Sequence, residues 1–144
     1  MPAETDARVV VAGAALAPVS RTPSPRDLVR FAHAANDYAP LHYDQDYARE
    51  RGFSRVIVHG FLKATMMSRV VTEWFGETGW LAELRTEYRR PDLVGEELTA
   101  HGTIREANEH ETTIDLWVES TSGERTATGF AVWRWNHTKG TQET

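Results

Sequence analysis

The sequence contains no cysteine among its 144 residues. Disulfides, thiolate nucleophiles and cysteine metal ligands are therefore excluded. Long apolar runs are missing too, and none approaches the roughly 20 residues that a membrane-spanning helix requires. The first residues lack the basic segment followed by an apolar one that is typical of a secretory signal. We therefore expect a cytoplasmic protein that does not bind a membrane.

The sequence also has fewer basic than acidic side chains. The 16 lysines and arginines are outnumbered by 21 aspartates and glutamates, which gives a net charge of −5. Nucleic-acid binding depends on cations that neutralise phosphates, so we expect no nucleic-acid partner. The spacing of the histidines also lacks the patterns that put two metal ligands on one face, and we predict no metal site. The six histidines are His33, His42, His59, His101, His110 and His137.

The composition is that of a globular protein, with 40% hydrophobic and 26% charged residues. A chain of this length suits one domain with a proper core, so residues 1–144 are expected to form a single domain. Its polar end, residues 136–144, is predicted to be a flexible tail.

The first half of the chain predicts one strand and then helices. Residues 9–16 are β-branched and alanine-rich, which predicts a strand that ends at Pro18. Ser24 and Asp27 then match a helix-capping box, and apolar residues at helical spacing predict a helix over Pro25–Ala35. A second, short helix is expected between residues 44 and 52, because Asp44 suits an N-cap.

A longer helix is predicted from Gly60 to Phe75, closed by Gly76. Its apolar residues cover most of the helix surface, so other structure must wrap around it. The rest of the chain alternates apolar and polar residues in four segments separated by short turns, at residues 82–89, 98–104, 114–118 and 126–135. We therefore predict an α+β fold in which an antiparallel sheet wraps around a long central helix.

Asp37 and His42 lie five residues apart across Pro40, in an otherwise apolar neighbourhood. An acid and an imidazole are costly in such a place unless both have chemistry to perform, so they are a candidate catalytic pair. Each also has a simpler interpretation. Asp37 suits a turn at a helix end, and His42 suits a core histidine satisfied by a backbone carbonyl.

These residues resemble the motifs of the MaoC-like hydratases and dehydratases, the (R)-specific enoyl-CoA hydratase and 3-hydroxyacyl-thioester dehydratase family of the hotdog fold. The resemblance rests on three motifs: Asp37-x-x-Pro40-x-His42-x-Asp44, Val58-His59-Gly60, and Arg90-Pro91 before Val94-Gly95-Glu96. One position departs from the family, which usually has asparagine where this chain has Ala39. That difference concerns the rigidity of the loop or the substrate preference, because asparagine can hold such a loop by hydrogen bonds.

The resemblance implies that Asp37 and His42 share acid and base duties in adding water to an enoyl thioester. It implies further that the backbone N–H of Gly60 forms the oxyanion hole, with His59 and Ser68 in supporting roles. Gly60 also suits close packing at a helix start, and Ser68 equally suits a surface serine. No cofactor is implied, because the substrate is itself carried as a coenzyme A or acyl-carrier-protein thioester.

Two groups of residues are candidates for substrate binding. Apolar side chains could line an acyl pocket, although residues at helical spacing are more often core; they are Met66, Met67, Trp74, Phe75 and Trp80. Arg85, Arg89 and Arg90 could meet the phosphates of the thioester carrier, or form a solvated strand face with neighbouring glutamates.

Partners and reaction remain open between several alternatives. The family implies edge-to-edge dimers, either a homodimer or a heterodimer with a paralogous hotdog subunit. The run from Val71 to Gly76 resembles the catalytic subunit of mycolic-acid-type dehydratases, which favours a paralogue. The alternatives in function are a thioesterase, addition of another nucleophile to the same double bond, and a non-catalytic acyl-thioester-binding subunit.

Overall fold

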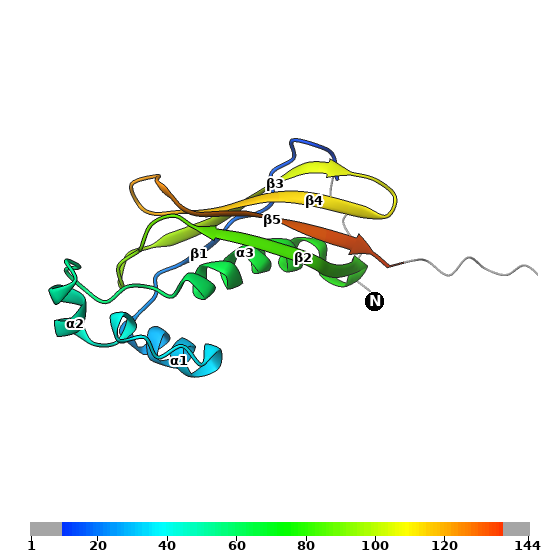
Figure 1. Ribbon diagram of the computed structural model, residues 1–144. Coiled ribbons are helices and arrows are strands. Elements are labelled where there is room, and N and C mark those ends of the chain that lie inside the picture. The colour runs from blue at the N-terminus through cyan, green and yellow to red at the C-terminus, as the bar shows by residue number, and fades with distance from the viewer. Residues whose placement is uncertain (1–9, 137–144) are drawn as a thin grey trace, which may run out of the picture.

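The computed structural model describes residues 10–136. A five-stranded antiparallel sheet has the strand order β1-β3-β4-β5-β2. The strands are β1 (Val19–Arg21), β2 (Gly79–Tyr88), β3 (Leu98–Ala107), β4 (Glu111–Glu119) and β5 (Arg125–Trp135). The sheet curls over one long helix, α3 (Gly60–Phe75), which lies along its concave face (Figure 1). This is the α+β hotdog architecture that the sequence predicts.

The core lies between α3 and the sheet. Apolar side chains of the helix are almost completely buried, among them Leu62, Met66, Met67, Val70 and Val71. The closest approach is at Gly102 in β3, where an added Cβ would lie only 3.0 Å from a methyl group of Val70. A glycine at this position lets the helix sit close to the strand. The wide apolar arc that the sequence places on this helix is therefore buried against the sheet.

A helical segment precedes α3 and stands beyond one end of the sheet (Figure 1). We call it the overhang, and it contains α1 (Pro25–Ala35), η1 (Pro40–His42) and α2 (Gln45–Glu50). The predicted capping box is present, because the Ser24 hydroxyl accepts from the Asp27 N–H and the Asp27 carboxylate accepts from the Ser24 N–H. Asp44 caps α2 through its carboxylate alone, which accepts from the N–H groups of Asp46 and Tyr47. Both helix starts are thus set by local side chains.

The predicted first strand is wrong in position. Val9 lies outside the described residues, and residues 10–16 make a turn at Gly13 (φ +88°) and only one isolated bridge, from Ala15 to Thr103. The regular pairing begins after Pro18, at β1, which runs antiparallel to β3. A glycine turn interrupts the ladder here, and proline has no N–H to continue it.

The predicted tail over residues 136–144 lies outside the described residues except for Asn136. The backbone N–H of Asn136 donates to the carbonyl oxygen of Thr78 at 2.9 Å. Across the part of the chain that the structure describes, no helix combines the length and apolarity needed to cross a membrane.

Candidate active site

Asp37 is presented by the end of α1. Asn36 adopts a left-handed conformation (φ 50°) that ends the helix, and the N–H of Asp37 donates to the carbonyl oxygen of Ala32. One carboxylate oxygen of Asp37, Oδ1, accepts from the backbone N–H of Ala39 at 3.3 Å. Asp37 is therefore a turn residue, as its simpler interpretation holds, yet this uses only one of its two oxygens. The other, Oδ2, faces His42.

His42 is held by the short helix η1 and by one backbone acceptor. Its Nδ1 lies 2.7 Å from the carbonyl oxygen of Ile57. A carbonyl can only accept, so Nδ1 carries the hydrogen and Nε2 of the neutral ring presents a lone pair. This Nε2 lies 3.7 Å from Oδ2 of Asp37, which is too long for a hydrogen bond. Two acceptors therefore face each other across a gap that one bridging water could fill.

His59 lies beneath His42. The two imidazole rings stack with centroids 3.7 Å apart and planes 20° apart. Its Nε2 donates to the backbone carbonyl oxygen of Asp37 at 3.2 Å, while its Nδ1 is buried without a hydrogen-bond partner. Burial lowers the pKa of His59, and the neighbouring His42 ring lowers it further, against the opposing effects of the Asp37 carbonyl and carboxylate. His59 is thus a neutral support that links both members of the pair.

Asp37, His42 and His59 bring ligand atoms within 4.8 Å of one another, a proximity that the sequence spacing does not predict. The geometry suits a metal ion poorly. The lone pairs of two stacked imidazoles lie in nearly parallel planes and do not converge on one point, and Nδ1 of His42 is already bonded to a carbonyl. The cluster is better suited to holding and moving a proton.

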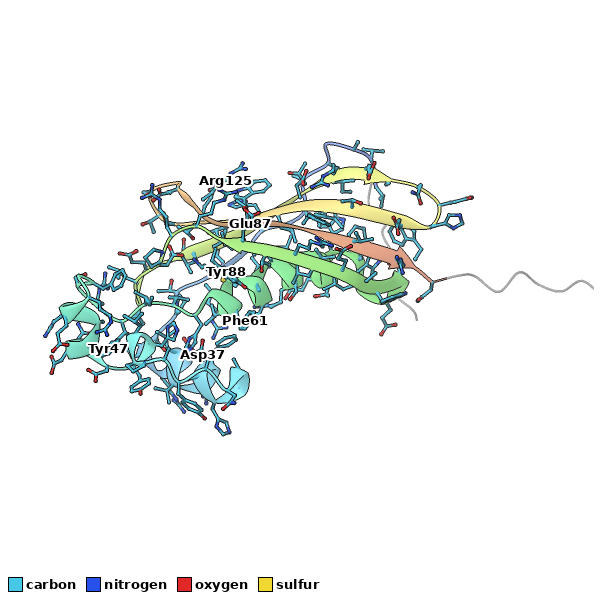
Figure 2. The ribbon with its side chains drawn as sticks, viewed as in Figure 1. Asp37, Tyr47, Phe61, Glu87, Tyr88 and Arg125 are labelled. Carbon is cyan, nitrogen blue, oxygen red and sulfur yellow. The ribbon has the colours of Figure 1, made fainter. Side chains whose placement is uncertain are left out.

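Gly60 and His42 line the same cavity of about 300 Å³, and Asp37 faces His42 without itself lining that cavity. The cavity is lined by residues of η1, of the segment that leads into α3, of α3 itself, and of the end of β2 with the segment after it; they are His42, Ile57, Val58, Gly60, Lys63, Tyr88, Arg89, Arg90 and Pro91. The N–H of Gly60 belongs to the first turn of α3, whose donors have no acceptor within the helix. Tyr88 forms a wall over this turn, because its ring lies 3.1 Å from where a Gly60 Cβ would stand. In Figure 2, Asp37 and Tyr88 flank the start of the helix.

Ser68 lies elsewhere. It lines a second cavity of about 440 Å³, and its hydroxyl donates to the carbonyl oxygen of Thr65 at 2.8 Å. Most of the lining of this cavity is apolar, and it comes from α1, α3 and β2; the residues are Phe31, Ala34, Ala35, Phe61, Ala64, Thr65, Ser68 and Leu84. The structure therefore joins Asp37, His42, His59 and Gly60 at one place, and puts Ser68 in a neighbouring cavity.

The apolar residues predicted to line an acyl pocket lie in the core, at the surface or in a third cavity. Met66, Met67 and Phe75 are core residues, while Trp80 is 52% exposed and outside both cavities. Trp74 lines a third cavity, with Val70 and Glu73. None of these five side chains therefore lines either cavity beside the overhang.

Of the three arginines predicted to meet the phosphates of the thioester carrier, only two line the cavity that holds Gly60. Arg89 and Arg90 line the cavity that holds Gly60, whereas Arg85 does not and pairs with Glu83 at 2.5 Å.

Sequence reasoning missed two polar side chains of the cavity around Gly60, Tyr88 and Lys63. Tyr88 was assigned only to a strand face, and Lys63 was not singled out. The available signal for Lys63 was a lysine within the apolar arc of a helix, because such a side chain is almost never buried without a partner. Its partner, Asp92, lies 29 residues further along the chain, and local patterns do not reveal the pairing.

The fold and the site together define a hotdog protein with an acid–imidazole pair at the first turn of its central helix. Residues 9–125 match the MaoC like domain, and the chain belongs to this family.

Curated relatives agree with this assignment. An (R)-specific enoyl-CoA hydratase of Aeromonas caviae is 29% identical over 110 residues, which cover 74% of this chain and 81% of that protein. A mitochondrial 3-hydroxyacyl-[acyl-carrier-protein] dehydratase of Arabidopsis thaliana is 30% identical over 79 residues, or 55% of this chain. The match spans only 47% of the Arabidopsis protein.

Solved structures show the same fold. The (R)-hydratase from A. caviae involved in PHA biosynthesis superposes with a TM-score of 0.83 at 26% identity, covering 90% of this chain and all of that one. The ChsH1-ChsH2 complex from Mycobacterium tuberculosis gives a TM-score of 0.81 at 22% identity, with 89% of this chain and 100% of that chain covered. Relatives of this fold therefore include a complex of two different subunits.

Proposed function

We propose that this protein adds water to trans-2-enoyl thioesters with (R) specificity, or removes it from 3-hydroxyacyl thioesters in the reverse direction. The observation that carries the proposal is that Asp37 Oδ2 faces His42 Nε2 at 3.7 Å, while His42 lines the same cavity as Gly60. A water between these two acceptors donates one hydrogen to each. Its oxygen lone pairs are then left free to attack the β carbon of a bound enoyl group.

The reaction balances with these groups alone. His42 Nε2 takes a proton from the water as the new C–O bond forms at the β carbon, and the double-bond electrons move onto the thioester oxygen. The Gly60 N–H, at the positive end of the α3 dipole, stabilises that oxyanion. The imidazolium of His42 then returns its proton to the α carbon, and Asp37 holds the water and balances the charge. Dehydration runs through the same steps in reverse.

The test uses crotonyl-CoA with the purified protein. Hydration predicts loss of the enoyl absorbance without release of free thiol, and (R)-3-hydroxybutyryl-CoA as the product. Free coenzyme A would instead indicate a thioesterase. Loss of absorbance only when an amine or thiol is added would indicate that the nucleophile is not water. Release of free coenzyme A, or a requirement for an added amine or thiol, contradicts the proposal.

Ala39 bears on the alternative of a non-catalytic subunit. Its backbone N–H still donates to Asp37 Oδ1, so the loop keeps a tether without the usual asparagine side chain. This favours an active subunit.

We infer that the protein works as a dimer with an identical or a paralogous hotdog chain. Activity of the purified protein alone supports the homodimer, and recovery only on adding a paralogue supports the heterodimer.

A further inference from the structure

Lys63 is a buried cation on the core-facing side of α3. Only 2% of its side chain is exposed, although it stands one turn after Gly60 on a helix face that is otherwise apolar. Burying an ammonium group is costly unless it is paired and hydrogen-bonded. Removing a partner of Lys63 therefore destabilises the protein more than removing a partner of a surface lysine.

Three oxygens surround the Lys63 ammonium. Nζ lies 2.9 Å from Asp92 Oδ2, 2.8 Å from the carbonyl oxygen of Arg90 and 3.4 Å from that of Thr126. The same Asp92 oxygen accepts the Thr126 hydroxyl at 2.6 Å. Asp92 is as buried as Lys63, so the two charges compensate each other away from solvent.

The network ties together the opposite walls of the cavity around Gly60. One wall is the first turn of α3, which carries Lys63. The other is the segment from Arg89 to Asp92, and the N–H groups of Arg89 and Arg90 donate to the Thr126 carbonyl at its base. The carbonyl of Asp92 also accepts from Val58, two residues before Gly60. Lys63 and Asp92 thus add a buried side-chain link to the backbone hydrogen bonds that join the two walls.

The linings of the two cavities differ in charge. The cavity around Gly60 is lined by two arginines, Arg89 and Arg90, and by Lys63, whose charge Asp92 compensates, whereas the cavity with Ser68 is mostly apolar. Arg89 and Arg90 are paired with Glu87 and Glu124 only through exposed contacts, which are weak and can yield to an anionic ligand. The phosphate-bearing half of a thioester therefore fits the first cavity, and the acyl half fits the second.

We infer that Lys63 and Asp92 are positioning residues, which hold the Arg89–Arg90 wall against the first turn of α3 so that the cavity grips the coenzyme half of the thioester. The inference rests on the proposed function. Neither residue touches the reacting atoms in this role. Loosening the pair therefore weakens binding of a full coenzyme A thioester more than binding of a thioester without the nucleotide.

The test compares two thioesters that cannot react, butyryl-CoA and S-butyryl-N-acetylcysteamine, by titration calorimetry. The variant is Lys63→Met with Asp92→Leu, since replacing both charges together avoids an uncompensated buried ion. We expect butyryl-CoA to bind about tenfold more weakly, because small displacements of binding groups are costly. The short thioester should change by less than about twofold, within the range typical of surface pairs.

A matched control removes an exposed pair from the same helix, by Arg69→Met with Glu73→Leu, and should leave both affinities unchanged. A folded Lys63/Asp92 variant with unchanged butyryl-CoA affinity overturns the inference, and so does equal weakening of both thioesters. If that variant does not fold, Thr126→Val decides, because it removes only one hydrogen bond to Asp92 and should weaken butyryl-CoA alone. Failure of the proposed function is seen separately, as wild-type binding without turnover of crotonyl-CoA.

Discussion

At the scale of single residues, the carboxylate of Asp37 is the group whose charge matters most. Asp37→Asn keeps the shape of the side chain, but a neutral amide no longer balances an imidazolium at His42 and can turn an N–H toward the water site. We expect kcat for crotonyl-CoA to fall about 10²- to 10⁴-fold. The measurement is steady-state hydration at fixed pH, with circular dichroism to check the fold.

The control for this substitution is Asp46→Asn, which removes an aspartate whose side chain is 91% exposed in α2. Its kcat should match the wild type. A fall of less than about fivefold for Asp37→Asn would leave the carboxylate with only its turn-forming role at Ala39.

His59 makes stability depend on pH in a defined direction. Its folded pKa lies below the ordinary 6.5, so the unfolded chain takes up this proton first as the pH falls. Above about pH 6.5 the titration of His59 therefore does not change the free energy of unfolding. Below that pH it lowers the free energy of unfolding, by up to about 1.4 kcal/mol per pH unit. Urea unfolding of the wild type and of His59→Gln from pH 8 to pH 5 should show the two curves converging as the pH falls.

The control is His110→Gln, because the side chain of His110 is 69% exposed. This variant should follow the wild-type curve at every pH. A constant difference between the wild type and His59→Gln across the whole range would mean that the buried ring contributes packing but no proton linkage.

At the scale of elements, the start of α3 and the end of β2 together shape the oxyanion position. A Cβ at Gly60 would meet the Tyr88 ring at 3.1–3.2 Å, so Gly60→Ala must displace the ring or the helix start. We expect kcat/KM for crotonyl-CoA to fall about 10²- to 10³-fold, as when an oxyanion donor is lost. Thermal unfolding measured alongside reports any cost in packing.

Combining Gly60→Ala with Tyr88→Ala separates two causes of that loss. If the added methyl acts by crowding the thioester oxygen, the double variant stays as slow as Gly60→Ala. If it acts by pushing the tyrosine, removing the ring restores most of the activity relative to Tyr88→Ala alone. Restoration would argue against Gly60 as the oxyanion residue.

Elements with local signals were predicted well. The bounds of α1 follow from a capping box and a left-handed residue that lie within the segment itself. The first strand was misplaced because its pairing depends on β3, about 80 residues further on, and because the turn at Gly13 cannot be read from β propensity. The stacking of His59 under His42 and the ion pair of Lys63 with Asp92 were missed for the same reason, since both join separate segments of the chain.

At the scale of the whole molecule, alternating strands after one long apolar helix were enough to predict the layers of the fold. Periodicity says which face of an element is buried, and a single helix and a single sheet bury their apolar faces by packing them together. Periodicity does not say where packing leaves space. Ser68 could therefore be assigned to the correct helix, while the division into two cavities with different charge required the three-dimensional arrangement.

The sheet ends at β2, and the outer edge of this strand is a candidate dimer interface. Among the described residues, β2 pairs with β5 and with no other strand, although it is ten residues long. An edge of that length presents unpaired backbone groups that favour pairing with another chain. Its charges do not repel a second copy, because Arg85 pairs with Glu83 within the strand and Glu87 pairs with Arg89 just after it.

We therefore expect the purified protein to have twice the 16.3 kDa mass of one chain, joined through β2. Light scattering during size exclusion over a dilution series gives the mass, and hydration of crotonyl-CoA at the same concentrations gives the activity. Both should fall together once dilution separates the subunits, because the cavity with Ser68 is lined in part by Leu84 of this edge strand. A fully active protein with the mass of one chain would show that the site is complete within a single subunit and that β2 has another partner or none.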